Sequence, residues 1–325
     1  MTVSQSAPGH RGLLRSVAAI PGAGLLLIAM MMVFSIANPS FLAQTNLVNL
    51  GLQASLLLMI ALPMTLIILT EGLDLSAGAL LGLSGVIVAH LLLAGSGVLV
   101  AGAAAVAVSL AFGALNGVLI GYLALPAFVV TLGTMGLMQG LALALTNGDP
   151  VGGFTPAIEA FYRARLWFLP VPTVITAALY ALFWLLLYRT RFGTYIIAIG
   201  GNKDALRLAG VRANVVHLGV YVLGSVVVGL SSILLIGRTN SAHPTVGIGM
   251  EFEAIAAVVL GGTSFEKGQG WLFGAVLGTF AITVMRNGLN ILAVDSSLQV
   301  VCIGALLILA LVIDQTRQQL VGRTA

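Results

Sequence analysis

The chain has 325 residues, of which 59% are hydrophobic and only 7% are charged. Soluble proteins are about 45–50% apolar, so this composition excludes an ordinary soluble domain and indicates a chain that spans a lipid bilayer. The net charge of +4 comes from a few residues beside apolar runs, which favours membrane-topology signals over nucleic-acid binding. The single cysteine excludes disulfides within the chain, and the residues indicate neither a metal site nor a cofactor.

Ten apolar runs follow one another along the chain. A spanning helix needs about 20 apolar residues, and lipid favours helices because each helix pairs its own backbone groups. The alternating pattern of a membrane barrel is absent. The sequence therefore predicts an all-α polytopic membrane protein, a single transmembrane domain over residues 1–325 with about ten helices, at residues 20–37, 47–70, 75–94, 98–120, 126–146, 166–188, 214–236, 252–263, 271–292 and 297–314.

The polar N-terminus carries Arg11 and Arg15 ahead of the first run. Lys and Arg are retained on the cytoplasmic side of a bilayer, so we expect the N-terminus there. A cleaved signal peptide is the alternative, although this run is longer than the usual hydrophobic core of one. With ten spans, the C-terminus with Arg317 and Arg323 is cytoplasmic too.

The segment 71–78 interrupts the apolar pattern with two acidic residues and a serine. Asp74 or Ser76 is expected to cap the helix that follows by accepting hydrogen bonds from its free N–H groups. Residues 66–78 also align with residues 258–270 as a faint internal repeat. Broken apolar segments at matching places in two halves of a chain point to a transport pathway.

Glycines recur at intervals of four residues along three predicted helices. Because lipid provides no hydrophobic drive between helices, such ridges let helix backbones approach one another closely. We expect helix packing at each ridge, with a gating hinge as the alternative: Gly113, Gly117 and Gly121; Gly136 and Gly140; and Gly270, Gly274 and Gly278.

The predicted spans contain neutral hydrogen-bonding side chains and few charges. Such side chains bond between helices, or they line a route for an uncharged polar solute. The candidate residues of a translocation pathway are Asn116, Thr131, Gln139 and Asn287, together with Phe128. Arg286 is a charge deep in a run, where it either snorkels to the interface or lines the pathway.

The segment 189–213 carries five of the fourteen Lys and Arg residues, which predicts a cytoplasmic loop. Within it, residues 200–211 have the pattern of a short amphipathic helix bracketed by glycines. We expect this helix to dock on a soluble partner. The predicted docking residues are Gly201, Asn202, Ala205, Leu208, Ala209 and Gly210.

The chain lacks the Gly-Lys-Ser/Thr motif that holds nucleotide phosphates, because its only lysines, Lys203 and Lys267, follow Asn202 and Glu266. No catalytic residue is indicated, since the four histidines are scattered and no nucleophile stands with a base. The chain is therefore expected to be no enzyme, and ATP hydrolysis is expected on a separate subunit.

The run at 252–263 covers little more than half of the roughly 30 Å hydrocarbon core. We favour a span that borrows residues from 247–251, which makes ten spans with both termini cytoplasmic. A re-entrant segment, which would leave nine spans and an external C-terminus, is the alternative.

Four motifs resemble the membrane permeases of ribose-type bacterial ABC sugar importers, which are relatives of the branched-chain amino acid permeases. They lie at 72–78 (GLDLSAG), 126–133 (PAFVVTLG), 201–211 (GNKDALRLAGV) and 253–264 (EAIAAVVLGGTS). The chain departs from the family pattern where Glu253 replaces the usual Asp, where Glu71 and Ala77 replace the commoner Gly and Val, and where Lys267 replaces a Gly.

The resemblance implies a multi-pass permease of the bacterial inner membrane. Its partners would be a second permease subunit, one or two ATP-binding subunits and a periplasmic sugar-binding protein. We therefore expect the permease subunit of an ABC importer for a monosaccharide such as ribose, with 189–213 as the loop that couples to the ATPase. One alternative is an ABC permease for another small polar solute, such as an amino acid. The other is an ion-coupled secondary transporter, which the scarcity of carboxylates in the spans disfavours.

Overall fold

The computed structural model describes residues 22–306 apart from 155 and 265–267, and in addition residues 308 and 312. Both termini, with Arg11, Arg15, Arg317 and Arg323, lie outside these residues, as does Lys267. The cytoplasmic placement of the two ends therefore stays a prediction.

Helices make up nearly the whole described chain, which confirms the predicted helical class. They are α2 (Gly22–Ala37), the 3₁₀ helix η1 (Pro39–Leu42), α3 (Gln44–Leu69), α4 (Ala77–Leu93), α5 (Val98–Gly121), α6 (Ala127–Thr146), α7 (Ala157–Arg163), α8 (Val171–Arg189), α9 (Arg191–Leu208), α10 (Ala213–Thr239), α11 (Met250–Leu260), α12 (Leu272–Ile291) and the helix Ser296–Leu306.

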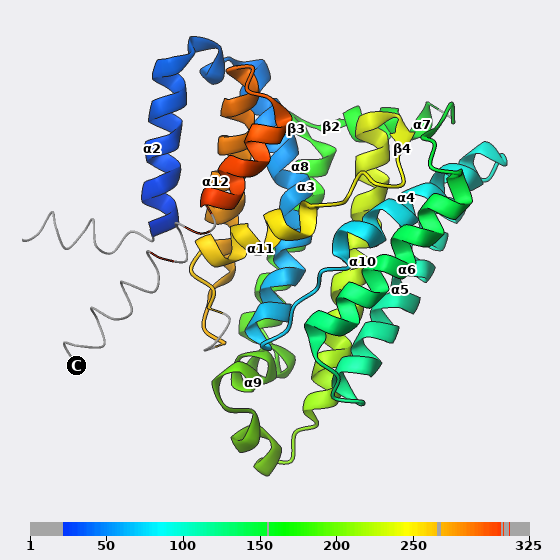
Figure 1. Ribbon diagram of the computed structural model, residues 1–325, viewed down its shortest axis with the longest axis vertical. Helices are drawn as coiled ribbons and strands as arrows, with labels where there is room; N and C mark the ends of the chain where they lie inside the picture. The colour runs from blue at the N-terminus through cyan, green and yellow to red at the C-terminus, as the bar shows by residue number, and fades with distance from the viewer. Residues whose placement is uncertain (1–21, 155, 265–267, 307, 309–311, 313–325) are drawn as a thin grey trace, which may run out of the picture.

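Two short strand pairs depart from the all-α prediction. Strand β1 (Val151–Gly152) pairs antiparallel with β4 (Ser241–Ala242), and β2 (Arg165–Leu166) pairs antiparallel with β3 (Leu169–Pro170). All four strands lie with α7 at one end of the bundle, whereas α9 lies at the opposite end (Figure 1). We call these the α7 end and the α9 end.

Six helices of the described residues are long and apolar enough to span a bilayer: α3, α5, α6, α8, α10 and α12. Apolar helices α2, α4 and Ser296–Leu306 are shorter. Helix α11 has 11 residues, which at 1.5 Å rise per residue cover about 16 Å, roughly half of a hydrocarbon core. A polytopic helical membrane protein is thus confirmed, and the count of ten spans stays a prediction.

Helix α3 is the centre of the fold. It is buried along most of its length and packs against α8, α10, α11 and α12. On one flank α4 packs between α5, α6 and α10, and on the other α12 packs against α2 (Figure 1). Helices α5 and α6 keep most of their leucine and valine side chains exposed, and α8 exposes Leu182, Trp184, Leu185 and Tyr188, as lipid-facing helices do.

Two helices begin at mid-height in the bundle, each after a non-helical segment. Residues 70–76 rise from the lower end of α3 to the start of α4, and residues 243–249 descend from the α7 end to the start of α11 (Figure 1). The two breaks touch each other. An ideal Cβ on Gly78 would lie 2.2 Å from the Gly247 carbonyl oxygen, and one on Gly247 would lie 2.1 Å from the Gly78 oxygen. Only glycine fits on either side of this crossing.

Two of the three predicted glycine ridges pack helices closely. An ideal Cβ on Gly117 would lie 2.8 Å from the Leu218 Cα of α10, and one on Gly278 would lie 1.8 Å from the Ala257 oxygen of α11. Gly136 and Gly140 of α6 meet no described atom within 4 Å, so the described residues do not form the packing predicted for that ridge.

Helix α9 begins earlier than the helix predicted at 200–211, because its first half buries Ile196 and Ile199 against the bundle. Asn202 interrupts it with an extended backbone, φ −163° and ψ 95°. At Gly200, an ideal Cβ would lie 2.3 Å from the Leu69 oxygen at the end of α3 and 2.4 Å from the Gly268 Cα in the loop after α11. Helix α9 therefore lies in direct contact with the end of α3 and with the loop after α11.

Candidate functional site

Side chains from three helices hold the broken backbone between α3 and α4. The hydroxyl groups of Tyr221 (3.0 Å) and Thr131 (3.3 Å) donate to the Leu73 carbonyl oxygen. The Asn116 amide donates to the Ser76 hydroxyl at 3.0 Å, and the Thr134 hydroxyl donates to the Asn116 amide oxygen at 2.8 Å. Non-helical backbone at membrane depth needs such partners, because no lipid group can supply them.

The expected capping of α4 differs in detail. Ser76 is the residue before the helix, but its side chain makes no capping hydrogen bond. Asp74 instead accepts from both the backbone N–H and the hydroxyl of Ser76. The carboxylate therefore stabilises the turn ahead of the helix and does not pair with the free N–H groups of the helix itself.

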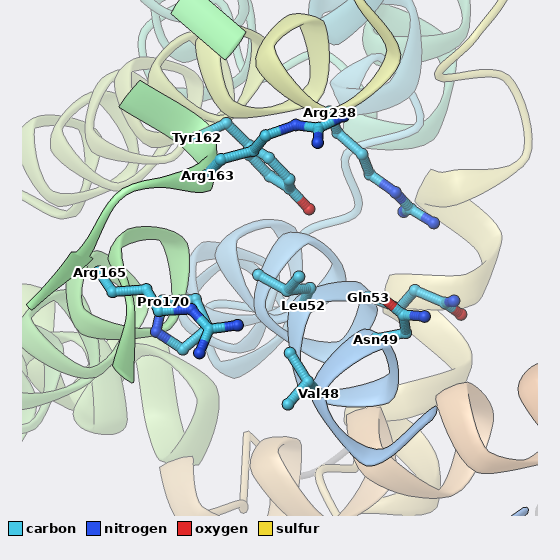
Figure 2. Close-up of a pocket in the computed structure, with 9 residues that line it drawn as sticks. All are labelled: Val48, Asn49, Leu52, Gln53, Tyr162, Arg163, Arg165, Pro170 and Arg238. Atoms are coloured by element: carbon cyan, nitrogen blue, oxygen red, sulfur yellow. The ribbon is translucent and has the colours of Figure 1, made fainter. Parts of the chain in front are cut away.

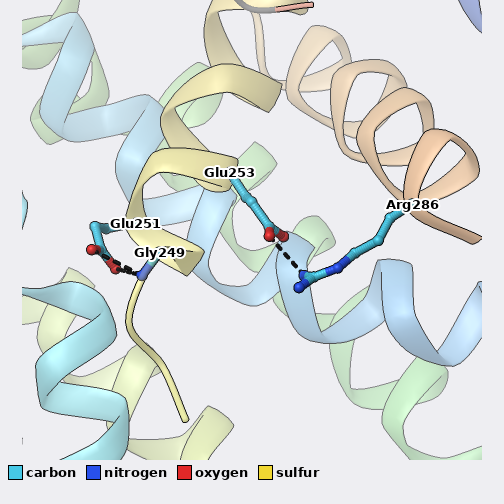
Figure 3. A network of polar contacts seen from close by, with 4 residues as sticks. All are labelled: Gly249, Glu251, Glu253 and Arg286. Carbon is cyan, nitrogen blue, oxygen red and sulfur yellow. Dashed lines mark hydrogen bonds and ion pairs between the residues drawn. The ribbon is translucent and has the colours of Figure 1, made fainter. Parts of the chain in front are cut away.

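Glu251 lies at the start of α11, on the side of the crossing. The residue is 1% exposed, and its carboxylate accepts from the Gly249 backbone N–H, with 3.1 Å to each oxygen (Figure 3). An ideal Cβ on Gly78 would lie 2.0 Å from Glu251 Oε2, so the carboxylate is enclosed between the two breaks.

Glu253 points away from the crossing and pairs with Arg286 of α12. Arg286 Nη1 donates to Glu253 Oε1 at 2.6 Å, with 13% of the glutamate side chain and 48% of the arginine side chain exposed (Figure 3). This ion pair bridges α11 and α12, and it places Arg286 in the lining of a cavity.

The pair lines a cavity of about 400 Å³, which we call the central cavity. It lies among α3, α10, residues 246–250, α11, α12 and the helix Ser296–Leu306. Its polar lining residues are Gln53, Arg238, Thr239, Glu253, Thr283, Arg286, Asn290, Ser296 and Gln299. The volume is within the range of about 300–1,000 Å³ that is usual for small-molecule sites.

A second cavity of about 610 Å³, which we call the α7-end cavity, adjoins it. Gln53 and Arg238 line both cavities. Figure 2 shows Tyr162, Arg163 and Arg238 over the α3 side chains of Leu52 and Gln53. Burial raises the pKa of the Tyr162 phenol, and the positive charge of Arg238 offsets part of this rise.

Comparison with known proteins now identifies the family. The family model for the permease component of branched-chain amino acid transport systems matches residues 46–311. The chain belongs to this permease family. No solved structure matches the permease significantly.

Curated relatives resemble the permease over nearly its whole length. The ribose import permease protein RbsC of Escherichia coli (strain K12) is 38% identical over 302 residues, which are 90% of this chain and 93% of the relative. RbsC of Bacillus subtilis (strain 168) is 37% identical, over 91% and 92% of the two chains. The D-allose transport system permease protein AlsC of Escherichia coli (strain K12) is 35% identical, over 90% and 91%. Together with its apolar helices, these relatives make the permease a multi-pass inner-membrane protein.

The structure brings two of the predicted pathway residues together. Asn116 and Thr131 are both fully buried and belong to the network around residues 73–76. On α6, Phe128 is 51% exposed and Gln139 is half-buried. Asn287 lies elsewhere, in a mutual amide pair with Asn46 of α3. None of these five predicted residues lines the central or the α7-end cavity.

The predicted docking residues lie at the α9 end of the permease. Gly201, Asn202, Leu208, Ala209 and Gly210 are exposed, whereas the side chain of Ala205 is not among those described. Leu208 is 91% exposed, and Leu206 is buried and anchors the short helical turn beside it. Gly210 ends that turn with φ +78°, and its N–H donates to the Arg207 oxygen at 3.0 Å.

Sequence reasoning missed Glu253 and Arg238 as residues of a polar cavity. A signal was present, because Glu253 and Arg286 are opposite charges in two neighbouring apolar runs of a chain with few charges. Buried charges in membrane helices usually pair with each other.

Proposed function

We propose that the permease is the membrane subunit of an ABC importer that translocates a monosaccharide delivered by a periplasmic binding protein. The observation that carries this proposal is the similarity, over about nine-tenths of the chain, to permeases named for ribose and D-allose. ATP is hydrolysed on a separate subunit, and two permease subunits form the translocation unit. Its topology has ten spans with both termini in the cytoplasm.

The end of α9 is the docking element for the ATPase. The break at Asn202 separates a short helical turn from the part of α9 that packs on the bundle. That turn presents Leu208 and Ala209 to solvent. An apolar side chain that a single chain leaves so exposed at its cytoplasmic end is suited to a cleft of a soluble partner.

Charge placed on this surface tests the docking assignment. We expect Ala205→Glu and Ala209→Glu to abolish co-purification with the ATPase and sugar-stimulated ATP hydrolysis, because a charge buried without a partner in the contact is strongly unfavourable. Ala160→Glu on exposed α7 is the matched control and should leave both readouts unchanged. Wild-type complex yield and hydrolysis in the α9 variants would place the docking surface elsewhere.

Reconstitution in liposomes tests the transport class. The permease with its ATPase and binding protein should accumulate a monosaccharide only when ATP is supplied. Accumulation by the chain alone, driven by a proton or sodium gradient, would overturn the importer assignment. ATP-driven uptake of a branched-chain amino acid in place of any sugar would favour the function for which the family model is named.

A reporter that is active only in the periplasm tests the ten-span topology. Fused after Arg317, it should stay silent. Activity at this position would make α11 a re-entrant helix and leave nine spans.

The route of the solute is proposed to include Asn116, Phe128, Thr131, Gln139 and Asn287. Asn116 and Thr131 support this through their contact with the broken segment ahead of α4, where movement of α4 would expose them. Discontinuous helices commonly flank the solute route of transporters.

A further inference from the structure

The central cavity contains polar groups that the protein leaves without partners. Among the described residues, the Glu253–Arg286 contact is the one hydrogen bond that the Arg286 guanidinium makes, although a guanidinium carries five N–H donors. Within the same residues, no protein group hydrogen-bonds to the side chains of Gln53, Arg238 or Asn290, which line the same cavity. Polar groups that line a cavity without protein partners are hydrated or bind a solute.

The ion pair presents donors and an acceptor side by side. Arg286 keeps free N–H groups, and Glu253 keeps a second oxygen free. A hydroxyl group both donates and accepts, so two neighbouring hydroxyls of one solute can donate to Glu253 and accept from Arg286 at the same time. The pair itself is neutral overall, so the part of the cavity around it suits a neutral solute, whereas the charge of Arg238, unpaired among the described residues, lies at the side shared with the α7-end cavity.

We propose that the central cavity binds the transported solute, and that Glu253 and Arg286 together determine its specificity for a neutral polyhydroxylated molecule of monosaccharide size. Gln53 and Asn290 supply further amide contacts from α3 and α12. Arg238 lies where the central cavity meets the α7-end cavity and so marks the entry. This inference rests on the proposed function and assigns the place where the sugar is held.

Cysteine protection tests occupancy of the cavity. In a Cys302→Ser background, Ser296→Cys places a thiol of nearly the same shape on the cavity wall, and Ser297→Cys places one on the adjacent residue, which does not line the cavity. The full permease is assembled with its ATPase and binding protein and alkylated with a maleimide, with and without ribose, D-allose or galactose. We expect a saturating sugar to slow alkylation of Ser296→Cys by about tenfold, the factor that 1.4 kcal/mol provides, and to leave Ser297→Cys unchanged.

Removal of the pair tests its role in specificity. With Arg286→Gln or Glu253→Gln, the protection should disappear and the ratio of uptake among the three sugars should change by about tenfold. Glu253→Asp keeps the carboxylate and should restore both. Asp149→Asn removes an exposed carboxylate that lines neither cavity, and should change neither.

The outcomes separate this inference from the function on which it rests. If the complex takes up sugar normally while no sugar protects Ser296→Cys, the cavity is not the solute site and the importer assignment stands. If the complex takes up none of the sugars under ATP, the proposed function itself fails. Because the protection assay uses the intact pair, it decides where the sugar is held even where Arg286→Gln does not fold, and Glu253→Gln then decides the role of the pair in specificity.

Discussion

Glu251 and Glu253 lie two residues apart in the first turn of α11, yet their surroundings are opposite. Two residues along a helix correspond to a rotation of about 200°, so the two side chains point to opposite faces. Glu251 faces the dry crossing and accepts from the backbone of its own helix end, whereas Glu253 faces the central cavity and pairs across it with Arg286. In a membrane protein, a polar side chain that pairs with the backbone therefore stabilises the fold. One that lines a cavity is available to contact a solute.

The largest effect is expected where one methyl group is added at the crossing of Gly78 and Gly247. Gly78→Ala and Gly247→Ala each place Cβ about 2 Å from a backbone oxygen that cannot move aside, as the 2.2 and 2.1 Å separations show. Overpacking costs about 1–3 kcal/mol or more, so we expect a loss of most folded permease, measured by size-exclusion chromatography in detergent. Gly51→Ala on α3, where no atom lies within 4 Å, should keep the wild-type yield. Normal yield of the Gly78 variant would show that the two breaks are not in contact.

Substitution of each glutamate by leucine compares the crossing, which Glu251 faces, with the central cavity, which Glu253 faces. Glu251→Leu leaves the part-buried Gly249 N–H without its acceptor, which costs about 1 kcal/mol and should lower the melting temperature of the purified permease. Glu253→Leu leaves Arg286 beside a hydrated cavity, so the melting temperature should fall less while sugar uptake is lost. The reverse order of melting temperatures would break the comparison.

Apolar substitutions in the network between α4, α5 and α6 test the predicted route. We expect Asn116→Leu and Thr131→Val to lower sugar flux while the complex with the ATPase still assembles. Asn116→Leu removes two hydrogen bonds, each worth about 0.5–1.5 kcal/mol, and Thr131→Val removes the bond to the Leu73 oxygen. Flux and complex yield that fall in proportion would assign both residues to packing, as would unchanged flux.

The smallest effect on stability is expected inside the central cavity. Among the described residues, the Asn290 side chain has no protein hydrogen bond to lose, so Asn290→Leu should leave the free energy of unfolding within about 0.5 kcal/mol of wild type. Sugar uptake should nevertheless fall, because the cavity becomes less polar. Wild-type uptake would mean that this wall of the cavity does not meet the solute.

The helices could be predicted from the sequence because lipid leaves an apolar run few alternatives to a helix. The two non-helical segments ahead of α4 and α11 were harder to predict. Residues 247–251 were expected to extend the short run at 252–263, whereas Gly247 and Gly249 lie in the descending segment ahead of α11. The sequence also did not indicate which glycine ridge packs against another helix. Gly117 and Gly136 occur in the same sequence pattern and differ only in their neighbours in the structure.

Residue type alone did not distinguish the two kinds of polar site. Asn116 and Asn290 are both amides within apolar runs, but Asn116 meets Ser76 whereas Asn290 meets a cavity. That difference depends on contacts between residues 40 or more apart in the chain, which hydropathy does not report. The pairing of Glu253 with Arg286 depends on tertiary contact in the same way.

The tight approach of Gly200 to Leu69 and Gly268 bears on the timing of transport. Helix α9 touches the end of α3, from which the segment to α4 departs, and also the loop that follows α11. A displacement of α9 would therefore reach the segment that leads into α4 and the loop that leaves α11 at the same time, through direct contacts. Because α11 is a rigid helix of 11 residues, a push on the loop behind it would be carried to Gly247 at its front, so both sides of the crossing would respond to one movement of α9.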